Sequence, residues 1–219
     1  MKYQPSGGSS TLALPTVQIF AALALIATIV IFLIGRSRRP IPNEPVVVVA
    51  KGNPLPGTQV VWLAGVLLSV VWPFGVFFAP NYAYHWPAFP DLADSWVVQI
   101  VGVALSIASG VLFSAAARTL GRQMTPVIQV RKNHELIQVG PFRYIRHPVY
   151  TAIVMLAVGQ SLFYLSLPVG LLALLLAGLA TYRARLEENL LKSPNAFGAA
   201  YVEYMNRTGR FLPRLRSRS

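Results

Sequence analysis

The sequence contains no cysteine, which excludes disulfide bridges, thiolate metal sites and cysteine nucleophiles. Charge is scarce as well, because charged residues make up 12% of the chain whereas a soluble domain usually carries about 25%. Among the charged residues the acidic ones are few, with 7 Asp and Glu against 19 Lys and Arg. Water cannot solvate a surface this poor in charge, so much of the protein must face lipid.

Hydrophobic residues make up 54% of the chain and gather in long runs. A helix of about 20 apolar residues crosses the hydrocarbon core of a bilayer, since each residue adds about 1.5 Å. Runs of this length predict spans at roughly 12–34, 60–78 and 95–117. A fourth apolar stretch, 149–182, is too long for one span and is interrupted near Pro168, which predicts two short helices in a hairpin. The predicted fold is an all-α integral membrane protein with about five transmembrane helices.

The basic residues predict the orientation of these spans. Three arginines directly follow the first run and only Lys2 precedes it, the reverse of the pattern in a cleaved signal peptide. With the N-terminus outside, the loops 35–59 and 118–148 and the tail from residue 183 lie in the cytoplasm and hold every Lys and Arg except Lys2. Orientation thus accounts for the formal net charge of +12, so we expect anionic lipid headgroups as partners and no nucleic acid.

Segment 140–150 stands out at the predicted cytoplasmic mouth of the fourth span. Gly140 and Pro141 break the helix there, and irregular backbone at membrane depth persists only where it is buried in protein or lines a cavity. His147 and Pro148 open the next helix, whose first amides would be free to bind an anion or a carboxylate. The alternative is an interfacial anchor, in which Arg and Tyr only reach toward the headgroups.

An acidic pair, Glu187 and Glu188, lies at the cytoplasmic end of the last predicted span, on a side that is otherwise basic. Arg183 precedes Glu187 by one helical turn and shares its helix face. One interpretation is an ion pair at the helix end, worth a few tenths of a kcal/mol. The other is an acidic anchor for a cationic ligand, with an arginine beside it for an anionic group.

Aromatic residues recur at helical spacing after the acidic pair. Phe197, Tyr201 and Tyr204 predict an amphipathic helix that either lies on the membrane or packs under the helical bundle. A basic turn, 207–213, follows this helix.

Several common chemistries lack the residues that they need. No glycine-rich phosphate-binding loop and no serine nucleophile elbow occurs in the sequence. The 3 histidines include His85, on the side predicted to be external, so a zinc site would require unusually well placed carboxylates. We therefore expect no metal.

Taken together and in order, these segments resemble the isoprenylcysteine carboxyl methyltransferase family and its phospholipid methyltransferase relatives. The resemblance covers roughly residues 118–213 and consists of Arg-His-Pro-x-Tyr, a later acidic pair, Phe-Gly-x-x-Tyr-x-x-Tyr and Arg-Phe-Leu-Pro. It implies methyl transfer from S-adenosylmethionine (SAM) to a lipophilic or lipid-modified acceptor at the boundary between membrane and cytosol. It also implies two regions: 1–117, with three spans and a Pro/Gly-rich linker at 35–59, and a catalytic part at 118–219. The catalytic part would comprise a cofactor loop, the transmembrane hairpin and the amphipathic helix, with a cytoplasmic cofactor pocket.

The resemblance also implies site residues, because in that family the Arg-His-Pro-x-Tyr motif and the segment before it enclose the cofactor. The implied cofactor-binding residues are Gln129, His134, Glu135, Leu136, Ile137, Gly140, Phe142, Arg146, His147, Pro148, Val149, Tyr150 and Glu187. The implied catalytic residues are Arg183, as the arginine on the substrate side, and Glu188, which becomes the acidic anchor if the register shifts by one residue. The family commonly has Tyr where Phe142 stands, so a hydroxyl contact is missing there.

Other functions remain open from the sequence. Within methyl transfer, carboxyl methylation of a prenylcysteine-type compound competes with amine methylation of a phospholipid. A membrane reductase similar to the sterol reductases would use NADPH and would need clustered arginines for its 2′-phosphate, against which the acidic pair argues. A non-catalytic membrane protein that binds lipid is the third alternative.

Overall fold

The computed structural model describes residues 15–23, 48–79, 95–131 and 135–214. Four long helices carry most of this chain, and their bounds are α2 (Thr58–Phe78), α4 (Ser95–Leu120), α5 (Pro148–Tyr164) and α6 (Leu167–Leu191). Three of them, α2, α4 and α6, are long and apolar enough to cross a membrane, and α5 is a shorter apolar helix. The prediction of a helical membrane protein is thereby confirmed. Of the predicted first span, the described residues 15–23 are helical, and the rest lies outside the described residues.

The predicted hairpin forms between α5 and α6, with Leu165 and Ser166 between the two helices. Leu165 has a φ of 50°, in the left-handed region, so the chain turns sharply where the sequence breaks. Helix α5 has 17 residues and is short as expected, whereas α6 has 25 because it continues past its apolar part to Leu191. The acidic pair therefore lies on the last turns of α6 itself.

The four helices supply residues to two compact units. The first unit comprises Met1–Arg38, Gly65–Ile107 and Met155–Leu174, and none of its described residues is charged. Gly102 permits a close approach of two helix backbones, since a Cβ there would lie 2.6 Å from the Gly159 carbonyl oxygen. The buried amide of Gln99 donates to the carbonyl oxygen of Phe163 at 2.9 Å.

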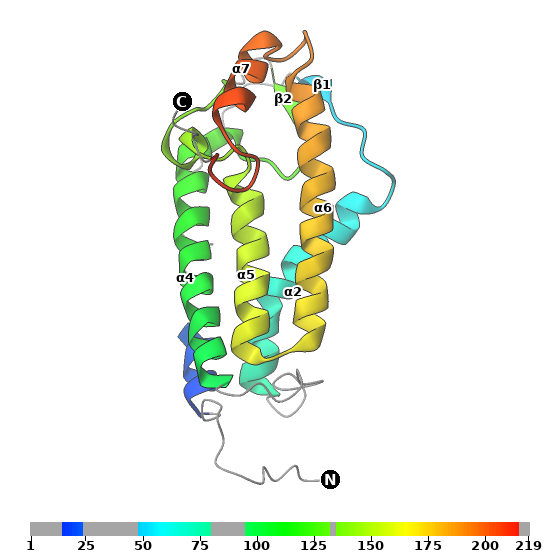
Figure 1. The fold of residues 1–219 in the computed structure, drawn as a ribbon. Coiled ribbons are helices and arrows are strands. Elements are labelled where there is room, and N and C mark those ends of the chain that lie inside the picture. The colour runs from blue at the N-terminus through cyan, green and yellow to red at the C-terminus, as the bar shows by residue number, and fades with distance from the viewer. Residues whose placement is uncertain (1–14, 24–47, 80–94, 132–134, 215–219) are drawn as a thin grey trace. The chain divides into compact units, whose positions relative to one another are not determined.

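The second unit comprises Arg39–Ala64, Ala108–Val154 and Leu175–Ser219. Its smaller elements are β1 (Val48–Lys51), η1 (Gly121–Gln123), β2 (Gln129–Arg131), η2 (Gly140–Arg143) and α7 (Ala199–Arg207). The strands pair antiparallel, and Figure 1 shows them with α7 around the ends of α4, α5 and α6 that belong to this unit. Tyr201 and Tyr204 of α7 are buried within the protein, so the packing interpretation of this amphipathic helix is correct.

Candidate active site

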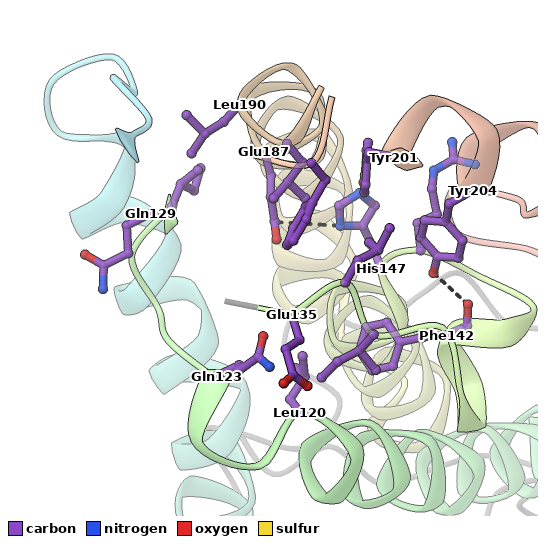
Figure 2. Close-up of a pocket in the computed structure, with 16 residues that line it drawn as sticks. Leu120, Gln123, Gln129, Glu135, Phe142, His147, Glu187, Leu190, Tyr201 and Tyr204 are labelled. Atoms are coloured by element: carbon purple, nitrogen blue, oxygen red, sulfur yellow. Dashed lines mark hydrogen bonds and ion pairs between the residues drawn. The ribbon is translucent and has the colours of Figure 1, made fainter. Parts of the chain in front are cut away.

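A pocket in the second unit collects most of the polar positions that the sequence singles out (Figure 2). Its walls come from the end of α4 with η1, from β2 and the segment after it, from η2 and the start of α5, and from the end of α6 with α7. The lining residues are Leu120, Gln123, Ile128, Gln129, Glu135, Leu136, Ile137, Phe142, Arg146, His147, Glu187, Leu190, Leu191, Phe197, Tyr201 and Tyr204.

Glu187 brings a carboxylate into this pocket. Its Oε2 accepts a hydrogen bond from the hydroxyl of Tyr150 at 3.0 Å and lies 3.7 Å from Nδ1 of His147. Its side chain is 35% exposed, so the carboxylate is open to a ligand. Among the described residues no ion pair joins it to Arg183, so the helix-end pair considered from the sequence does not form.

Glu188, the next residue, has a different environment although it adjoins Glu187 in sequence. It is buried, and its carboxylate contacts three cationic or titratable groups: Arg146 Nε at 2.9 Å, His147 Nε2 at 3.3 Å and Arg210 Nη2 at 2.6 Å. The hydrogen bonds that Arg210 donates to Glu188 raise the pKa of Arg210, which keeps this guanidinium charged. Glu188 does not line the pocket, and its contacts connect α6 with the start of α5 and with the C-terminal segment.

The C-terminal segment also binds the Arg-His-Pro turn through its backbone. The amide of Arg146 donates to the Gly209 carbonyl at 2.9 Å, and the amide of His147 donates to the Arg210 carbonyl at 3.1 Å. These two amides precede α5 and are occupied because the basic turn after α7 pairs with this stretch of backbone. The expectation that the first amides of α5 itself bind an anion or a carboxylate stays a prediction.

The side chain of Arg146 strengthens the same connection. Its Nη1 donates to the backbone carbonyls of Met205, at 3.1 Å, and of Thr208. Because Nε is bonded to Glu188 as well, this guanidinium is largely occupied by the protein itself.

His147 and Tyr150 form a stacked pair at the start of α5. Their ring centroids lie 5.4 Å apart with an interplanar angle of 9°. The stack places the imidazole between the two glutamates and the phenol against Glu187. These side chains therefore couple the pocket to the ion-pair cluster of Glu188.

The tyrosines of α7 close another side of the pocket. The hydroxyl of Tyr204 donates to the carbonyl oxygen of Phe142 at 2.6 Å, which Figure 2 shows as a dashed line. Burial raises the pKa of Tyr204 to about 12 and also raises the pKa of Tyr201, so both remain neutral phenols.

Arg183 is buried on α6, with 2% of its surface exposed, and it does not line the pocket. Its Nη1 donates to Oε1 of Gln59, and its Nη2 donates to the carbonyl oxygen of Pro126 at 2.6 Å. The guanidinium lies 5.4 Å from the ring centroid of Trp62 and 6.0 Å from that of Tyr150. No carboxylate of the described residues lies within ion-pairing distance, and the buried Nε has no hydrogen-bond partner.

The structure thus divides the residues implied by the resemblance into two groups. Those that line the pocket are Gln129, Glu135, Leu136, Ile137, Phe142, Arg146, His147 and Glu187. Those that do not line it are Gly140, Pro148, Val149, Tyr150, Arg183 and Glu188. His134 lies outside the described residues.

Gln123 is a pocket residue that no pattern in the sequence indicates. Its Oε1 is buried and has no hydrogen-bond partner in the described part of the chain, so the pocket contains an open acceptor. The apolar walls Leu120, Ile128, Leu190 and Leu191 were equally unpredictable, because nothing in their spacing distinguishes them from lipid-facing residues. Tyr201 and Tyr204 carried a signal, their helical spacing, which indicated a helix but not its position beside the pocket.

Comparison with known proteins supports this part of the chain. Residues 100–193 match the model of the isoprenylcysteine carboxyl methyltransferase (ICMT) family. A probable protein-S-isoprenylcysteine O-methyltransferase of Oryza sativa subsp. indica is 33% identical over 129 residues, which make up 57% of this chain and 66% of that protein. Protein-S-isoprenylcysteine O-methyltransferase B of Arabidopsis thaliana is 30% identical over 129 residues, 57% of this chain and 64% of that protein. The chain therefore spans about two thirds of the length of these relatives.

A solved structure agrees at the level of the fold. The eukaryotic intramembrane Ras methyltransferase ICMT has a TM-score of 0.50 and 21% identity, over 74% of this chain and 53% of that one. The family match includes the Arg-His-Pro-x-Tyr turn, the hairpin and the acidic pair, the segments whose side chains meet at the pocket and the Glu188 cluster. Residues 100–193 are therefore similar in sequence to the isoprenylcysteine carboxyl methyltransferase family.

Proposed function

We propose that this protein transfers a methyl group from SAM to the carboxylate of a prenylcysteine-type lipophilic acceptor, at the boundary between membrane and cytosol. The observation that carries the proposal is the contrast between two residues one helical turn apart on α6. Glu187 opens into the pocket as a carboxylate, whereas Arg183 is buried with no carboxylate partner among the described residues. One turn of helix thereby offers an anion to a cationic donor and a cation to an anionic acceptor.

The pocket residues suit SAM, which carries a cationic sulfonium and an amino-acid end. Glu187 would bind the ammonium group, since it is the open carboxylate on α6. Gln123 would accept a hydrogen bond from a donor on the cofactor, because its buried Oε1 has no partner among the residues that the structure describes. The rings of Phe142 and Tyr201 would pack against the adenine or the sulfonium, as aromatic faces attract cations. When bound, SAM supplies an electrophilic methyl group.

Methylation of a carboxylate needs the acceptor in its ionised form and needs no catalytic base. A terminal carboxyl group has a pKa of about 3.5, so it is ionised at neutral pH and no residue has to remove a proton. Arg183 would hold this carboxylate in place and keep it ionised. Positioning of this kind contributes much of the rate in a displacement reaction. The buried, unpaired guanidinium favours a carboxylate acceptor over the amine of a phospholipid, because a cationic amine would be repelled.

The same residues argue against the NADPH alternative. The 2′-phosphate of NADPH would need free arginines, and Arg146 is the one arginine among the residues described as lining the pocket. Its Nε and Nη1 already bond to Glu188 and to two backbone carbonyls. Negative charge from Glu187 and Glu135 disfavours a phosphate further.

Transfer of a labelled methyl group tests the proposal directly. Purified protein would be incubated with methyl-labelled SAM and, separately, an S-prenylated cysteine with a free carboxylate, its carboxamide, and phosphatidylethanolamine in vesicles. We expect label only with the free carboxylate, released by mild base as expected for a methyl ester. Label in the phospholipid would instead establish amine methylation. Absence of both methyl transfer and SAM binding, by calorimetry, would leave the non-catalytic alternative.

The orientation proposed with this function puts the pocket and the C-terminus in the cytoplasm and the N-terminus outside. Because the chain has no cysteine, single cysteines can be introduced without background labelling. Asn195→Cys should react with an impermeant maleimide only from the cytoplasmic side, and Asn81→Cys only from the opposite side. The reverse pattern would refute the orientation and leave the proposed chemistry untouched.

A further inference from the structure

The first turn of α2 lies outside the segment that matches the family, yet it contacts Arg183 in the second unit. The hydroxyl of Thr58 joins this turn to the segment before it by donating to the Leu55 carbonyl at 2.7 Å. The Leu55 amide in turn donates to the hydroxyl of Tyr182 at 2.8 Å, one residue before Arg183. The turn is therefore attached to α6 beside the guanidinium.

Gln59 holds the guanidinium with an amide whose orientation is determined. Its Oε1 can only accept, and it accepts from Arg183 Nη1. Its Nε2 can only donate, and it donates to the Pro126 carbonyl at 3.1 Å. The same carbonyl accepts from Arg183 Nη2, so one amide and one carbonyl form a two-point clamp. Both acceptors are neutral, and the clamp orients Arg183 without cancelling its charge.

Trp62 acts on the same guanidinium from its ring face. The indole is 4% exposed and lies 5.4 Å from the Arg183 guanidinium carbon. The ring also meets Tyr150 edge to face, with centroids 5.4 Å apart and an interplanar angle of 81°. A ring face stabilises a cation and excludes water, and like the clamp it leaves the positive charge intact.

A buried charge with neutral partners alone is costly unless a counter-ion completes the site. The guanidinium of Arg183 is such a charge, and its buried Nε has no hydrogen-bond partner among the described residues. The missing anion is most simply the acceptor itself. We infer that Gln59 and Trp62 are positioning residues that hold Arg183 uncompensated, and that α2 thereby sets the preference for an anionic acceptor. The inference rests on the proposed function and identifies the residues that determine its selectivity for the acceptor.

Exchange of Gln59 for glutamate provides the sharpest test. Gln59→Glu keeps the size of the side chain but puts a carboxylate against Arg183. This carboxylate would pair with the guanidinium and compete with the carboxylate of the acceptor. We expect the KM for the prenylated cysteine carboxylate to rise about tenfold or more, as expected for a lost charged hydrogen bond. The Kd for SAM should stay within about twofold of wild type. Gln138→Glu is the matched control, because this exposed glutamine accepts a hydrogen bond from an exposed arginine, Arg207.

Trp62 provides an independent test that adds no charge. Trp62→Leu removes the ring face and should raise the KM for the carboxylate acceptor several-fold, whereas Trp62→Phe keeps a ring face and should restore most of it. SAM affinity serves as the measure of correct folding in each variant. If a Gln59 variant does not bind SAM, the comparison of the two Trp62 variants decides.

The results of these experiments distinguish failure of the positioning role from failure of the proposed methyltransferase function. If wild type methylates the carboxylate and both Gln59→Glu and Trp62→Leu retain its acceptor KM, the positioning role is refuted and the methyltransferase stands. If wild type binds no SAM and transfers no methyl group, the proposed function fails and the inference fails with it. A raised acceptor KM with unchanged SAM affinity, relieved in Trp62→Phe, supports both.

Discussion

The two compact units draw on the same four helices and are held together in opposite ways. The first has no charged residue among those described, and it relies on close backbone contact at Gly102 and on the buried amide of Gln99. The second contains a buried glutamate with two arginines and a histidine, and a buried arginine with no acid. Small residues let helices pack where no hydrophobic force exists between them, as in lipid. Buried charges are found where polar ligands bind. Each of the four helices therefore carries small or apolar contacts in its first-unit part and contributes to a polar unit in its second-unit part.

Removal of the central acid should have the largest effect on the second unit. Glu188→Ala leaves Arg146 buried without its carboxylate and removes one of the two carboxylates beside His147, and breaking a buried ion pair costs about 3–5 kcal/mol. We expect a strong fall in the midpoint of thermal unfolding in detergent and loss of SAM binding. Glu203→Ala, which removes an exposed acid of α7, is the control and should change little. An unchanged midpoint in Glu188→Ala would mean that charge does not hold this unit together.

Removal of the neighbouring acid should affect binding and leave folding intact. In Glu187→Ala a half-buried carboxylate is lost, and Tyr150 and His147 lose one contact each. We expect SAM affinity to fall by about tenfold to a hundredfold, since a charged hydrogen bond contributes about 1.5–3 kcal/mol. Calorimetry measures the affinity, and circular dichroism during heating checks the fold. A near-normal affinity of Glu187→Ala for SAM would show that Glu187 does not bind the ammonium group of the cofactor.

A methyl group in the first unit tests the other side of the comparison. Gly102→Ala would place a Cβ 2.5 Å from the backbone nitrogen of Phe163, and such overpacking costs about 1–3 kcal/mol. Gly110→Ala on the same helix is the control, because a Cβ there meets nothing within 4 Å. The midpoint of thermal unfolding should fall in the first variant and hold or rise slightly in the second. Equal midpoints would remove the evidence for close helix contact.

Loss of a single hydroxyl from the pocket wall should have the smallest effect. Tyr204→Phe removes the hydrogen bond to the Phe142 carbonyl and leaves a buried acceptor unpaired, at a cost of about 1 kcal/mol. Tyr144→Phe removes the same atom from a residue that is 58% exposed and should be neutral. A small fall in the unfolding midpoint and a modest loss of SAM affinity are expected for Tyr204→Phe alone. If both variants behave alike, the hydroxyl of Tyr204 does not support the pocket.

The helices, their breaks and the chemical nature of the site were predictable from the sequence. Long apolar runs predict helices because a backbone in lipid has to satisfy its own hydrogen bonds. The break near Pro168 was predictable because the apolar stretch 149–182 is too long for one span. The rarity of acidic residues on a basic side of the membrane indicated that Glu187 and Glu188 are unusual. The division of the chain at residue 117 and the individual site residues stay predictions.

What the sequence could not decide was which partner each polar residue meets. Glu187 and Glu188 are adjacent and chemically identical, and only the direction of each side chain on α6 turns one to the pocket and the other to Arg146 and Arg210.

Gln59 and Trp62 carried no local signal, because a single glutamine or tryptophan at the start of an apolar run looks like any other interfacial residue. Gln123 carried none either, because it is one polar residue within a polar loop.

The sequence by itself determined a charge-poor, helical membrane protein with a methyltransferase-like turn, since composition and motif act locally. Only the tertiary structure decided that Arg183 is clamped by α2 and left without an anion, because that contact joins residues far apart in the chain.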